Sequence, residues 1–142
     1  MTRLTLVFLI VFISMVSLKA QGDEQMVANL TVKIEGSIAS AGKLQLALYS
    51  SENDWLKNEM KTLYIDVAQD DNHTFHIEGL SVGTYAIAVI HDKNNNGELD
   101  MGMMGPTEKY GFSNNARGMF GPATYSDASF YVEYDEVITI KL

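Results

Sequence analysis

The sequence contains no cysteine. The protein therefore has no disulfide and no thiol chemistry, and a lipid cannot be attached through a cysteine at a signal cleavage site. Basic residues are scarce as well, because 10 Lys and Arg stand against 18 Asp and Glu, for a formal net charge of −8. Nucleic acids and anionic membranes repel such a chain, since binding to phosphate depends on Lys and Arg. Cations and neutral or basic partners remain open.

Long apolar runs are also missing, except at the N-terminus. Arg3 precedes an apolar run over residues 4–16, and the small residue Ala20 follows it. This pattern predicts a secretory signal peptide at residues 1–20, cleaved after Ala20; the alternative is an uncleaved anchor. The run is shorter than the ~20 residues that span a bilayer. We expect residues 21–142 to form a single domain in the periplasm or outside the cell.

Apolar and polar residues alternate with a period of two through most of the remaining chain, which predicts strands. The predicted strands cover residues 29–35, 43–49, 63–67, 75–77, 84–91, 128–133 and 137–142. The first two, joined by the turn Ala41-Gly42, are predicted to form a hairpin. Residues 84–91 are apolar at nearly every position, which is typical of a central strand. About seven short strands without a long amphipathic helix predict an all-β fold, a two-layer antiparallel β-sandwich.

Two aromatic residues lead to structural expectations. Tyr85 enters its strand directly after the turn at residues 79–83, as a tyrosine does at the corner of Greek-key sandwiches. Trp55 lies in a segment, residues 51–58, that predicts a helical turn at most. We expect Trp55 to cover one end of the core; the alternative is an exposed residue that stacks on a ligand.

A site-like segment follows the predicted central strand. Residues 92–100 read Asp-Lys-Asn-Asn-Asn-Gly-Glu-Leu-Asp, so oxygen-bearing side chains recur at every second position and a glycine follows the third of them. This spacing lets a looped backbone direct several oxygens at one hard cation, and it matches the first nine positions of a calcium loop. Carboxylates, amides and carbonyls suit calcium better than zinc, which prefers thiols and histidines.

The match to the helix–loop–helix calcium motif ends there, because Met103 stands where a bidentate Glu is needed and the loop follows a strand. Another residue must supply the missing carboxylate, and we expect it from Glu108. The predicted calcium ligands are the side chains of Asp92, Asn94, Asn96 and Asp100, the backbone carbonyl of Glu98 and the carboxylate of Glu108. The alternative is a turn without an ion, because Asn96-Gly97 favours hairpin turns and Asx side chains bond their own backbone.

The next segment, residues 101–126, is rich in glycine and shows no strand pattern. Its aromatic residues argue against disorder, so we expect a packed loop that lies over the cation site. Four methionines, Met101, Met103, Met104 and Met119, occur in this segment. We expect them to be flexible apolar filling; the alternative is a set of soft ligands for copper.

Signals for an enzyme are weaker. His91, Asp92, Glu108 and Ser113 can be assembled into an acid–base or nucleophilic site, yet no nucleophile elbow or metalloprotease motif accompanies them. An envelope hydrolase that uses His91, Asp92 and Glu108 is therefore an alternative to a non-catalytic function. It requires an accessible His91.

Two stretches carry a resemblance to a known family. Residues 83–100, with the Asp-x-Asn-x-Asn-Gly loop, and residues 105–115, with Pro-Thr-Glu-Lys-Tyr-Gly-Phe-Ser, resemble the bacterial exported family called domain of unknown function (DUF) 2141. The likeness spans nearly all of residues 21–142. It implies a bacterial origin, an envelope location and a small β-sandwich similar to immunoglobulin or transthyretin folds. It implies no reaction.

The expected function is that of an exported, non-catalytic binding or accessory module, in which a calcium-ordered loop holds the glycine-rich segment in a shape for recognition. We expect the partner to be a polysaccharide or another envelope protein. A polysaccharide would need exposed aromatic planes near the loop, for which Trp55, Tyr110 and Phe112 are candidates. A purely structural domain without a bound ion is the remaining alternative.

Overall fold

The structure, a computed structural model, describes residues 26–36 and 38–142. The predicted signal peptide at residues 1–20 lies outside the described residues. Within them the fold is all-β, with these elements: β1 (Val27–Glu35), β2 (Lys43–Tyr49), β3 (Lys61–Asp66), β4 (Thr74–Ser81), β5 (Gly83–Asp92), β6 (Met101–Gly102), β7 (Gly105–Pro106), β8 (Tyr110–Phe112), η1 (Ser113–Asn115), α1 (Tyr125–Ala128), β9 (Phe130–Val132) and β10 (Glu136–Lys141). No helix in this part of the chain has the length and apolarity that a membrane span requires.

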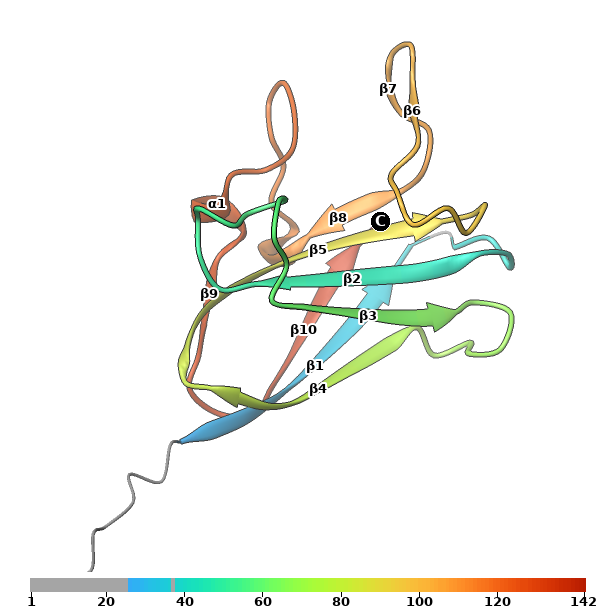
Figure 1. The fold of residues 1–142 in the computed structure, drawn as a ribbon. Coiled ribbons are helices and arrows are strands. Elements are labelled where there is room, and N and C mark those ends of the chain that lie inside the picture. The colour runs from blue at the N-terminus through green and yellow to red at the C-terminus, as the bar shows by residue number, and fades with distance from the viewer. Residues whose placement is uncertain (1–25, 37) are drawn as a thin grey trace, which may run out of the picture.

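Two sheets face each other (Figure 1). The first sheet has the strand order β10-β1-β4, and the second has the order β3-β2-β5-β8, with β9 also paired to β5. The strands β6 and β7 form a small hairpin of their own. Figure 1 shows this hairpin and the loop between η1 and α1 projecting from the same side of the second sheet.

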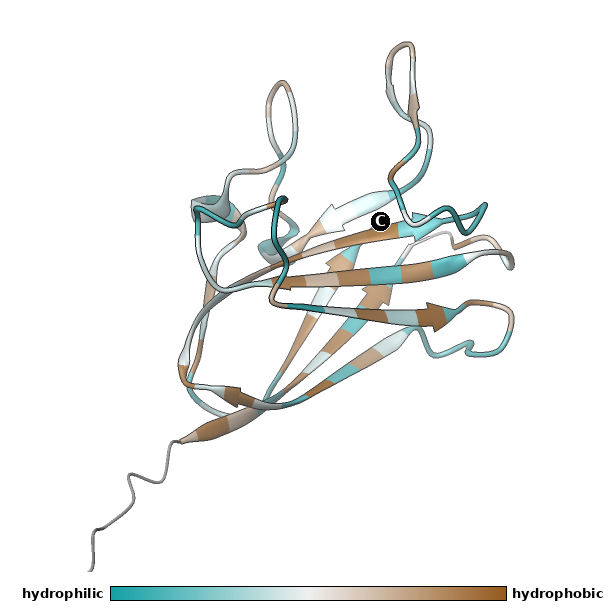
Figure 2. Ribbon diagram, in the orientation of Figure 1, coloured by the Kyte–Doolittle hydropathy of each residue, from teal (hydrophilic) through white to brown (hydrophobic). Residues whose placement is uncertain are grey.

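The core lies between the two sheets and is built by the alternating apolar residues of both. Strand β1 contributes Leu30, Val32 and Ile34, each at most 5 % exposed, while its intervening residues face outward. Figure 2 shows the same banding along the strands of both sheets. Each fully buried Leu, Ile or Val of this kind stabilises the fold by about 1.5–3 kcal/mol. Because the chain has no disulfide, its stability depends on this apolar core.

Strand β5 is the central strand that the sequence predicted, because it pairs with β2, β8 and β9. The predicted tyrosine corner is also present. The Tyr85 hydroxyl donates a hydrogen bond to the Ser81 carbonyl at 2.7 Å, and the Tyr85 side chain is packed in the core. This bond fixes the angle at which the chain passes from β4 in one sheet to β5 in the other.

The predicted hairpin between the first two strands is wrong. Strand β1 pairs with β10 and β4, whereas β2 pairs with β3 and β5, so the chain crosses between the sheets after Glu35. Alternation identified the buried face of each strand correctly, but it carries no information about the pairing partner. The turn before β2 instead approaches the end of β5, where a Cβ built on Gly42 would lie 2.2 Å from the Asp92 carbonyl oxygen.

The expectation of a wholly antiparallel fold also needs correction. Strands β1 and β10 run parallel, in a register from Leu30 opposite Glu136 to Glu35 opposite Lys141. The parallel pair arises because the chain leaves the second sheet after Val132 and enters the first sheet from the end at which β1 begins. The other strand pairs are antiparallel in the part of the chain that the structure describes.

Two segments between the main strands differ from the predictions. Residues 101–126, expected as an irregular loop, contain β6, β7, β8 and η1 and the start of α1. Ala128, predicted as the first residue of the strand at residues 128–133, is the last residue of helix α1. Strand β9 is therefore shorter than expected. The first turn of α1 is held by Thr124, whose hydroxyl accepts the backbone N–H of Asp127 at 3.2 Å. Residues 51–58 form turns, in agreement with the expectation of a helical turn at most.

Candidate functional site

The loop of residues 92–100 folds through hydrogen bonds that its own side chains make to its backbone. Asn94 Oδ1 accepts the Asn96 N–H at 3.1 Å, and Asn96 Oδ1 accepts the Glu98 N–H at 2.9 Å. Between these two turns Gly97 has φ +82°, a conformation that glycine adopts without strain. Asn94, Asn96 and Gly97 therefore specify the path of the loop before any ligand is considered. Figure 2 shows the loop as a hydrophilic segment at the end of β5.

Asp92 is the buried acid at the start of the loop. Its side chain is only 3 % exposed. Its Oδ1 accepts the Asn96 N–H at 3.1 Å and its Oδ2 accepts the Gly97 N–H at 2.8 Å. Two backbone N–H groups thus pair with both oxygens of this buried carboxylate. Asp92 therefore places a negative charge at the base of the loop and holds the turn around that charge.

Glu108 reaches the loop from outside it. The residue precedes β8 and is 6 % exposed. Its Oε1 accepts the Lys93 N–H at 2.7 Å, and its Oε2 accepts the Asp100 N–H at 3.1 Å. One carboxylate thus connects the first and the last turn of the loop. Glu108 therefore contacts the loop, and its role as a metal ligand stays a prediction.

Asp100 closes the ring of interactions. Its Oδ2 accepts the Asn94 side-chain N–H at 2.7 Å, and its Oδ1 accepts the Asn96 side-chain N–H at 2.8 Å. Asp92, Asn94, Asn96, Asp100 and Glu108 are thereby brought together. In these hydrogen bonds, every donor to the carboxylates of Asp92, Asp100 and Glu108 is an uncharged amide N–H group. Negative charge is concentrated here without a cationic side chain among those donors.

Glu98 differs from the other predicted ligands. Its side chain is exposed, whereas its backbone N–H takes part in the loop. No three Asp, Glu, His or Cys side chains among residues 26–36 and 38–142 cluster closely enough to hold a metal ion by themselves. The loop can therefore hold a hard cation only if amide and carbonyl oxygens join the carboxylates, which is the donor set that calcium accepts.

The hydrolase hypothesis fails on the position of His91. This side chain is 0 % exposed, and its Nε2 donates to the Ala41 carbonyl at 2.9 Å. His91 and Asp92 are neighbours in a strand, so their side chains point to opposite faces of the second sheet. Ser113 is equally buried and donates its hydroxyl hydrogen to the Ala128 carbonyl at 2.5 Å. An acid–base or nucleophilic site that needs an accessible His91 is therefore excluded.

Trp55 packs as predicted, beside Tyr49, Phe112 and Tyr125. Its indole N–H donates to the Ala123 carbonyl at 2.9 Å. The indole thus belongs to a small aromatic cluster over one end of the second sheet. This position argues against the alternative of a free stacking residue.

A hollow that the sequence did not predict lies on the outer face of the second sheet. We call it the outer trough. Strands β2, β5 and β8 form its floor. In one cross-strand row, Gln45 lies opposite Ile90 and Ile90 lies opposite Tyr110. In the next row, Ala47 lies opposite Ala88. The volume of the trough is about 560 Å³. Three strands distant in sequence supply this floor, so no local pattern could reveal it.

The loop of residues 92–100 forms one wall of the outer trough. Glu98, Leu99 and Met101 line this wall, and Gly121 and Pro122 line the opposite one. Met101 belongs to the β6–β7 hairpin, and Gly121 and Pro122 belong to the loop between η1 and α1, which are the two projecting segments seen in Figure 1. The shape of the trough is therefore coupled to the conformation of the predicted calcium loop.

The methionines do not fill the interior, which corrects the prediction. Met103 and Met104 are 105 % and 102 % exposed at the turn between β6 and β7, and Met119 is also exposed. Phe120, beside Met119 in the other projecting loop, is 98 % exposed. Large apolar side chains thus extend into solvent from both walls of the trough. Exposed apolar groups gathered in this way are typical of interaction sites.

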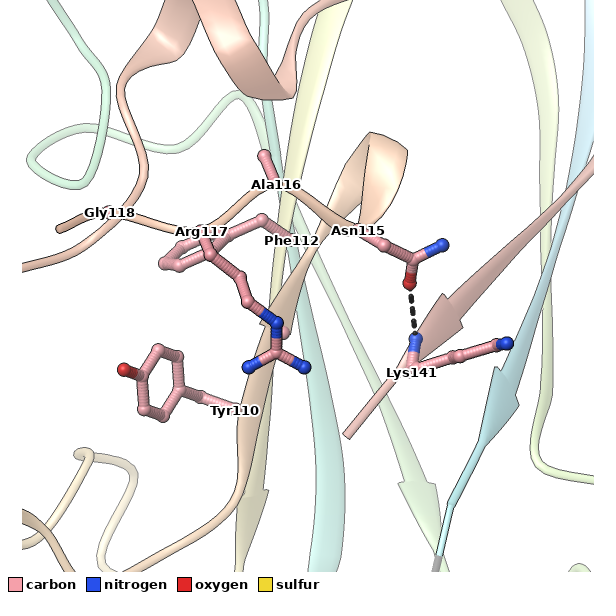
Figure 3. Close-up of a pocket in the computed structure, with 8 residues that line it drawn as sticks. Tyr110, Phe112, Asn115, Ala116, Arg117, Gly118 and Lys141 are labelled. Carbon is pink, nitrogen blue, oxygen red and sulfur yellow. Dashed lines mark hydrogen bonds between the residues drawn. The ribbon is translucent and has the colours of Figure 1, made fainter.

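A smaller hollow of about 100 Å³ lies between β8, β10 and the loop after η1 (Figure 3). Tyr110, Asn115, Arg117 and Lys141 border it, and Asn115 Oδ1 accepts the Lys141 backbone N–H at 2.8 Å. Figure 3 shows the Arg117 guanidinium between the ring of Tyr110 and Lys141. The hollow has room for about three water molecules, so it is a minor feature beside the outer trough.

Comparison with known proteins gives one match. A family model described as "uncharacterized protein conserved in bacteria (DUF2141)" matches residues 32–140. This range includes the loop of residues 92–100 and Glu108, and it extends from β1 into β10. Neither the comparison with curated proteins nor that with solved structures found a match.

Proposed function

Because the chain belongs to the bacterial DUF2141 family, as its sequence led us to expect, we propose that it is a non-catalytic binding or accessory domain of the cell envelope whose loop of residues 92–100 is ordered by calcium. The family description names no activity, so the proposal depends on the site itself. One observation supports it above all. Glu108, which is distant from the loop in sequence, bonds both ends of that loop with one buried carboxylate.

The chemistry of the loop favours a hard cation. Asp92, Asp100 and Glu108 carry negative charge, and amide N–H groups alone compensate that charge in the hydrogen bonds described above. Rotation of the Asn94 and Asn96 side-chain amides would turn their oxygens toward Asp100. Oxygens would then face oxygens, and this arrangement is stable only with a cation between them. Calcium would thus replace two amide donors as the positive partner of Asp100.

In this proposal the calcium ligands are those predicted from the sequence. They are the side chains of Asp92, Asn94, Asn96, Asp100 and Glu108 and the backbone carbonyl of Glu98. When bound, calcium would supply charge neutralisation and rigidity, and no reaction step. Because Glu98 and Leu99 line the outer trough, an ordered loop would fix one wall of the surface that meets a partner.

Thermal unfolding with excess calcium and with a chelator tests the proposal. If free calcium exceeds its dissociation constant a hundredfold, binding adds ~2.7 kcal/mol to the stability of the native state. The unfolding midpoint should therefore rise by several degrees. Asp100→Asn should abolish this rise. Asp100→Asn is a better test than Asp92→Ala. The Asp92 carboxylate also accepts two backbone N–H groups, so its removal would destabilise the loop even when no ion is bound.

Asp70→Asn is the matched control. Asp70 also accepts a backbone N–H within its own turn, from Asn72 at 2.8 Å, but it lies in the connection between β3 and β4. This variant should keep the calcium-dependent rise of the wild type. An equal midpoint of the wild type in calcium and in chelator would instead leave the ion-free turn as the correct interpretation and the domain as a purely structural one.

The envelope location is part of the proposal. The acidic chain without cysteine and the N-terminal pattern of residues 1–20 support it. Expression of the full chain in a bacterium with its own secretion machinery, followed by intact-mass measurement of the exported protein, should give a chain that begins at Gln21. A cell-associated chain that retains residues 1–20 would contradict cleavage.

We also propose that the two facing sheets form a sandwich of the immunoglobulin or transthyretin type with a Greek-key path. The Tyr85–Ser81 hydrogen bond and the non-sequential strand order support this assignment. An experimental structure tests it by the strand orders β10-β1-β4 and β3-β2-β5-β8. A different strand order in either sheet would contradict it.

The partner class remains the one expected from the sequence, a polysaccharide or another envelope protein. Tyr64 and Tyr110 favour a carbohydrate, because both are exposed and lie in the same cross-strand row on the outer face of the second sheet. A glycan array in calcium and in chelator tests this partner. Binding to no glycan in either condition would remove the polysaccharide.

A further inference from the structure

The outer trough exists because its floor carries very small side chains. Ala47 and Ala88 are cross-strand neighbours on the two central strands of the second sheet. Larger residues surround them, with Ile90 and Tyr110 in the adjacent row and Phe112 beside Ala88. Two methyl groups at the centre of a ring of large side chains leave a hollow of about 560 Å³. This volume lies in the range of sites for small organic ligands.

The lining of the trough selects against charged and strongly polar ligands. None of its lining residues is Lys, Arg or His, and Glu98 is the one acid among them. An anionic ligand would find no ion-pair partner there and would meet both Glu98 and the formal net charge of −8. Apart from Glu98, the polar side chains of the lining are those of Gln45, Tyr49 and Tyr110. The surface therefore fits an uncharged and mostly apolar molecule.

Gln45 adds a specific polar contact on this floor. Its side-chain oxygen is buried and has no hydrogen-bond partner in the described part of the chain. An unsatisfied buried oxygen is destabilising, and such groups are rare in native proteins. The oxygen is shielded from solvent as the side chain stands, so the amide presents its oxygen to a ligand in the trough only after rotation. A hydroxyl group can pair with either the oxygen or the nitrogen of the amide, because it both donates and accepts.

From these observations we infer that the outer trough binds an uncharged, largely apolar molecule that carries a hydroxyl group, with this hydroxyl on the Gln45 amide. The inference deepens the proposed function and rests on it, since the predicted calcium loop supplies the wall with Glu98 and Leu99. The exposed Met101 also lines the trough. Methionine suits this position because its flexible side chain adapts to ligands of different shape.

Displacement of Nile red, an uncharged apolar fluorophore, by 1-decanol and by decanoate tests the inference. The two competitors have the same chain length and differ in the charge of the head group. Decanol should displace the dye, and decanoate should do so at least about tenfold less well because its carboxylate meets Glu98. Failure of decanol to displace the dye, or equal displacement by both, would overturn the inference.

Three variants connect this binding to the trough. Ala88→Leu fills the floor and should abolish binding of the dye. Thr31→Leu places the same side chain on the outer face of β1 in the first sheet and should leave binding unchanged. Gln45→Met should retain Nile red but lower the affinity for decanol by about two- to tenfold, the equivalent of one lost neutral hydrogen bond. Far-UV circular dichroism establishes that each variant is folded.

The two proposals can fail separately. Dye displacement is measured in calcium and in chelator, beside the unfolding midpoints. Binding of decanol without a calcium-dependent rise in the midpoint would contradict the calcium loop and retain the trough. A calcium-dependent rise without binding of decanol would contradict the trough and retain the calcium loop. Binding to the Ala88→Leu variant equal to that of the wild type would place the dye elsewhere and overturn the inference.

Discussion

Glu108 accepts the Lys93 N–H at 2.7 Å across fifteen positions of the chain. The same carboxylate accepts the Asp100 N–H with its other oxygen. The loop of residues 92–100 is therefore closed from outside by one side chain, which the short strand β8 holds in place.

Glu108→Gln should lower the free energy of unfolding by about 1–3 kcal/mol, because the amide nitrogen would face a backbone N–H donor and leave it unpaired. Urea denaturation measures this change. Glu133→Gln is the control, since Glu133 is exposed and a substitution there should stay within about 0.5 kcal/mol. Equal losses in both variants would show that the closure contributes nothing specific.

Substitutions of Gly42 and Gly79 test the two places at which the chain crosses between the sheets. Gly42 lies in the crossing from β1 to β2, and Gly79 lies near the end of β4, before the crossing to β5. Both have positive φ, +86° and +67°, but only Gly42 lacks space for a side chain, because its Cβ would lie 2.2 Å from the Asp92 carbonyl oxygen. Gly79→Ala should cost about 1–2 kcal/mol from backbone strain alone. Gly42→Ala should cost about 3 kcal/mol or more, because the backbone must also move. Thermal or urea unfolding compares them, and a smaller loss at Gly42 would contradict the close approach.

Tyr85→Phe should lower the stability near neutral pH by about 1 kcal/mol, because the hydrogen bond to Ser81 is lost. It should also change the alkaline limb of the stability curve. Burial raises the pKa of Tyr85 above its ordinary value of 10.0. The native state thus holds this proton more tightly than the unfolded state, so its stabilising contribution is complete below pH 10 and is lost as the pH rises through the raised pKa.

The stability of the wild type should therefore fall above pH 10 more steeply than that of Tyr85→Phe. Urea unfolding at a series of alkaline pH values measures both slopes. Tyr134→Phe, at an exposed tyrosine, serves as the control and should retain the slope of the wild type. Parallel curves for the wild type and Tyr85→Phe would contradict the role of the tyrosine corner in this pH range.

Trp55 is the single tryptophan of the chain, so its fluorescence reports on the aromatic cluster around it. We expect the emission change and the far-UV circular dichroism change to coincide during urea unfolding, because this cluster packs on the sheet as part of one cooperative unit. Trp55→Phe should cost about 1–3 kcal/mol, since the Ala123 carbonyl loses its partner. An emission change at lower urea than the dichroism change would show that the cluster opens independently.

The sequence predicted the features that local chemistry determines. Strand β5 was recognisable because it is apolar at nearly every position. The loop after it was recognisable because oxygen-bearing side chains recur at every second position. Glu108 was nominated because the loop lacks a carboxylate where Met103 stands and Glu108 is an acid in the segment that follows. These signals depend on neighbouring residues only, so they survive in a single sequence.

Features that depend on strand pairing were missed. The alternation of apolar and polar residues in β1 and β2 is the same whether these strands pair with each other or lie in different sheets. Alternation therefore offered no physical basis for predicting a hairpin. The outer trough needs Ala47 opposite Ala88, a register that is set by the whole second sheet. The exposed methionines were misread because apolar composition alone does not distinguish a buried loop from a projecting one.

The parallel pairing of β1 with β10 decides which end of the domain faces away from an attachment point. Because both strands run in the same direction, the start of β1 lies at one pole and Leu142 at the other, toward the end of the domain at which β5 leads into the loop of residues 92–100 (Figure 1). A tether at the N-terminal pole would present the trough outward, whereas a fusion after Leu142 would crowd it. Immobilisation through the N-terminal pole is therefore the geometry in which ligand capture by this domain should be measured.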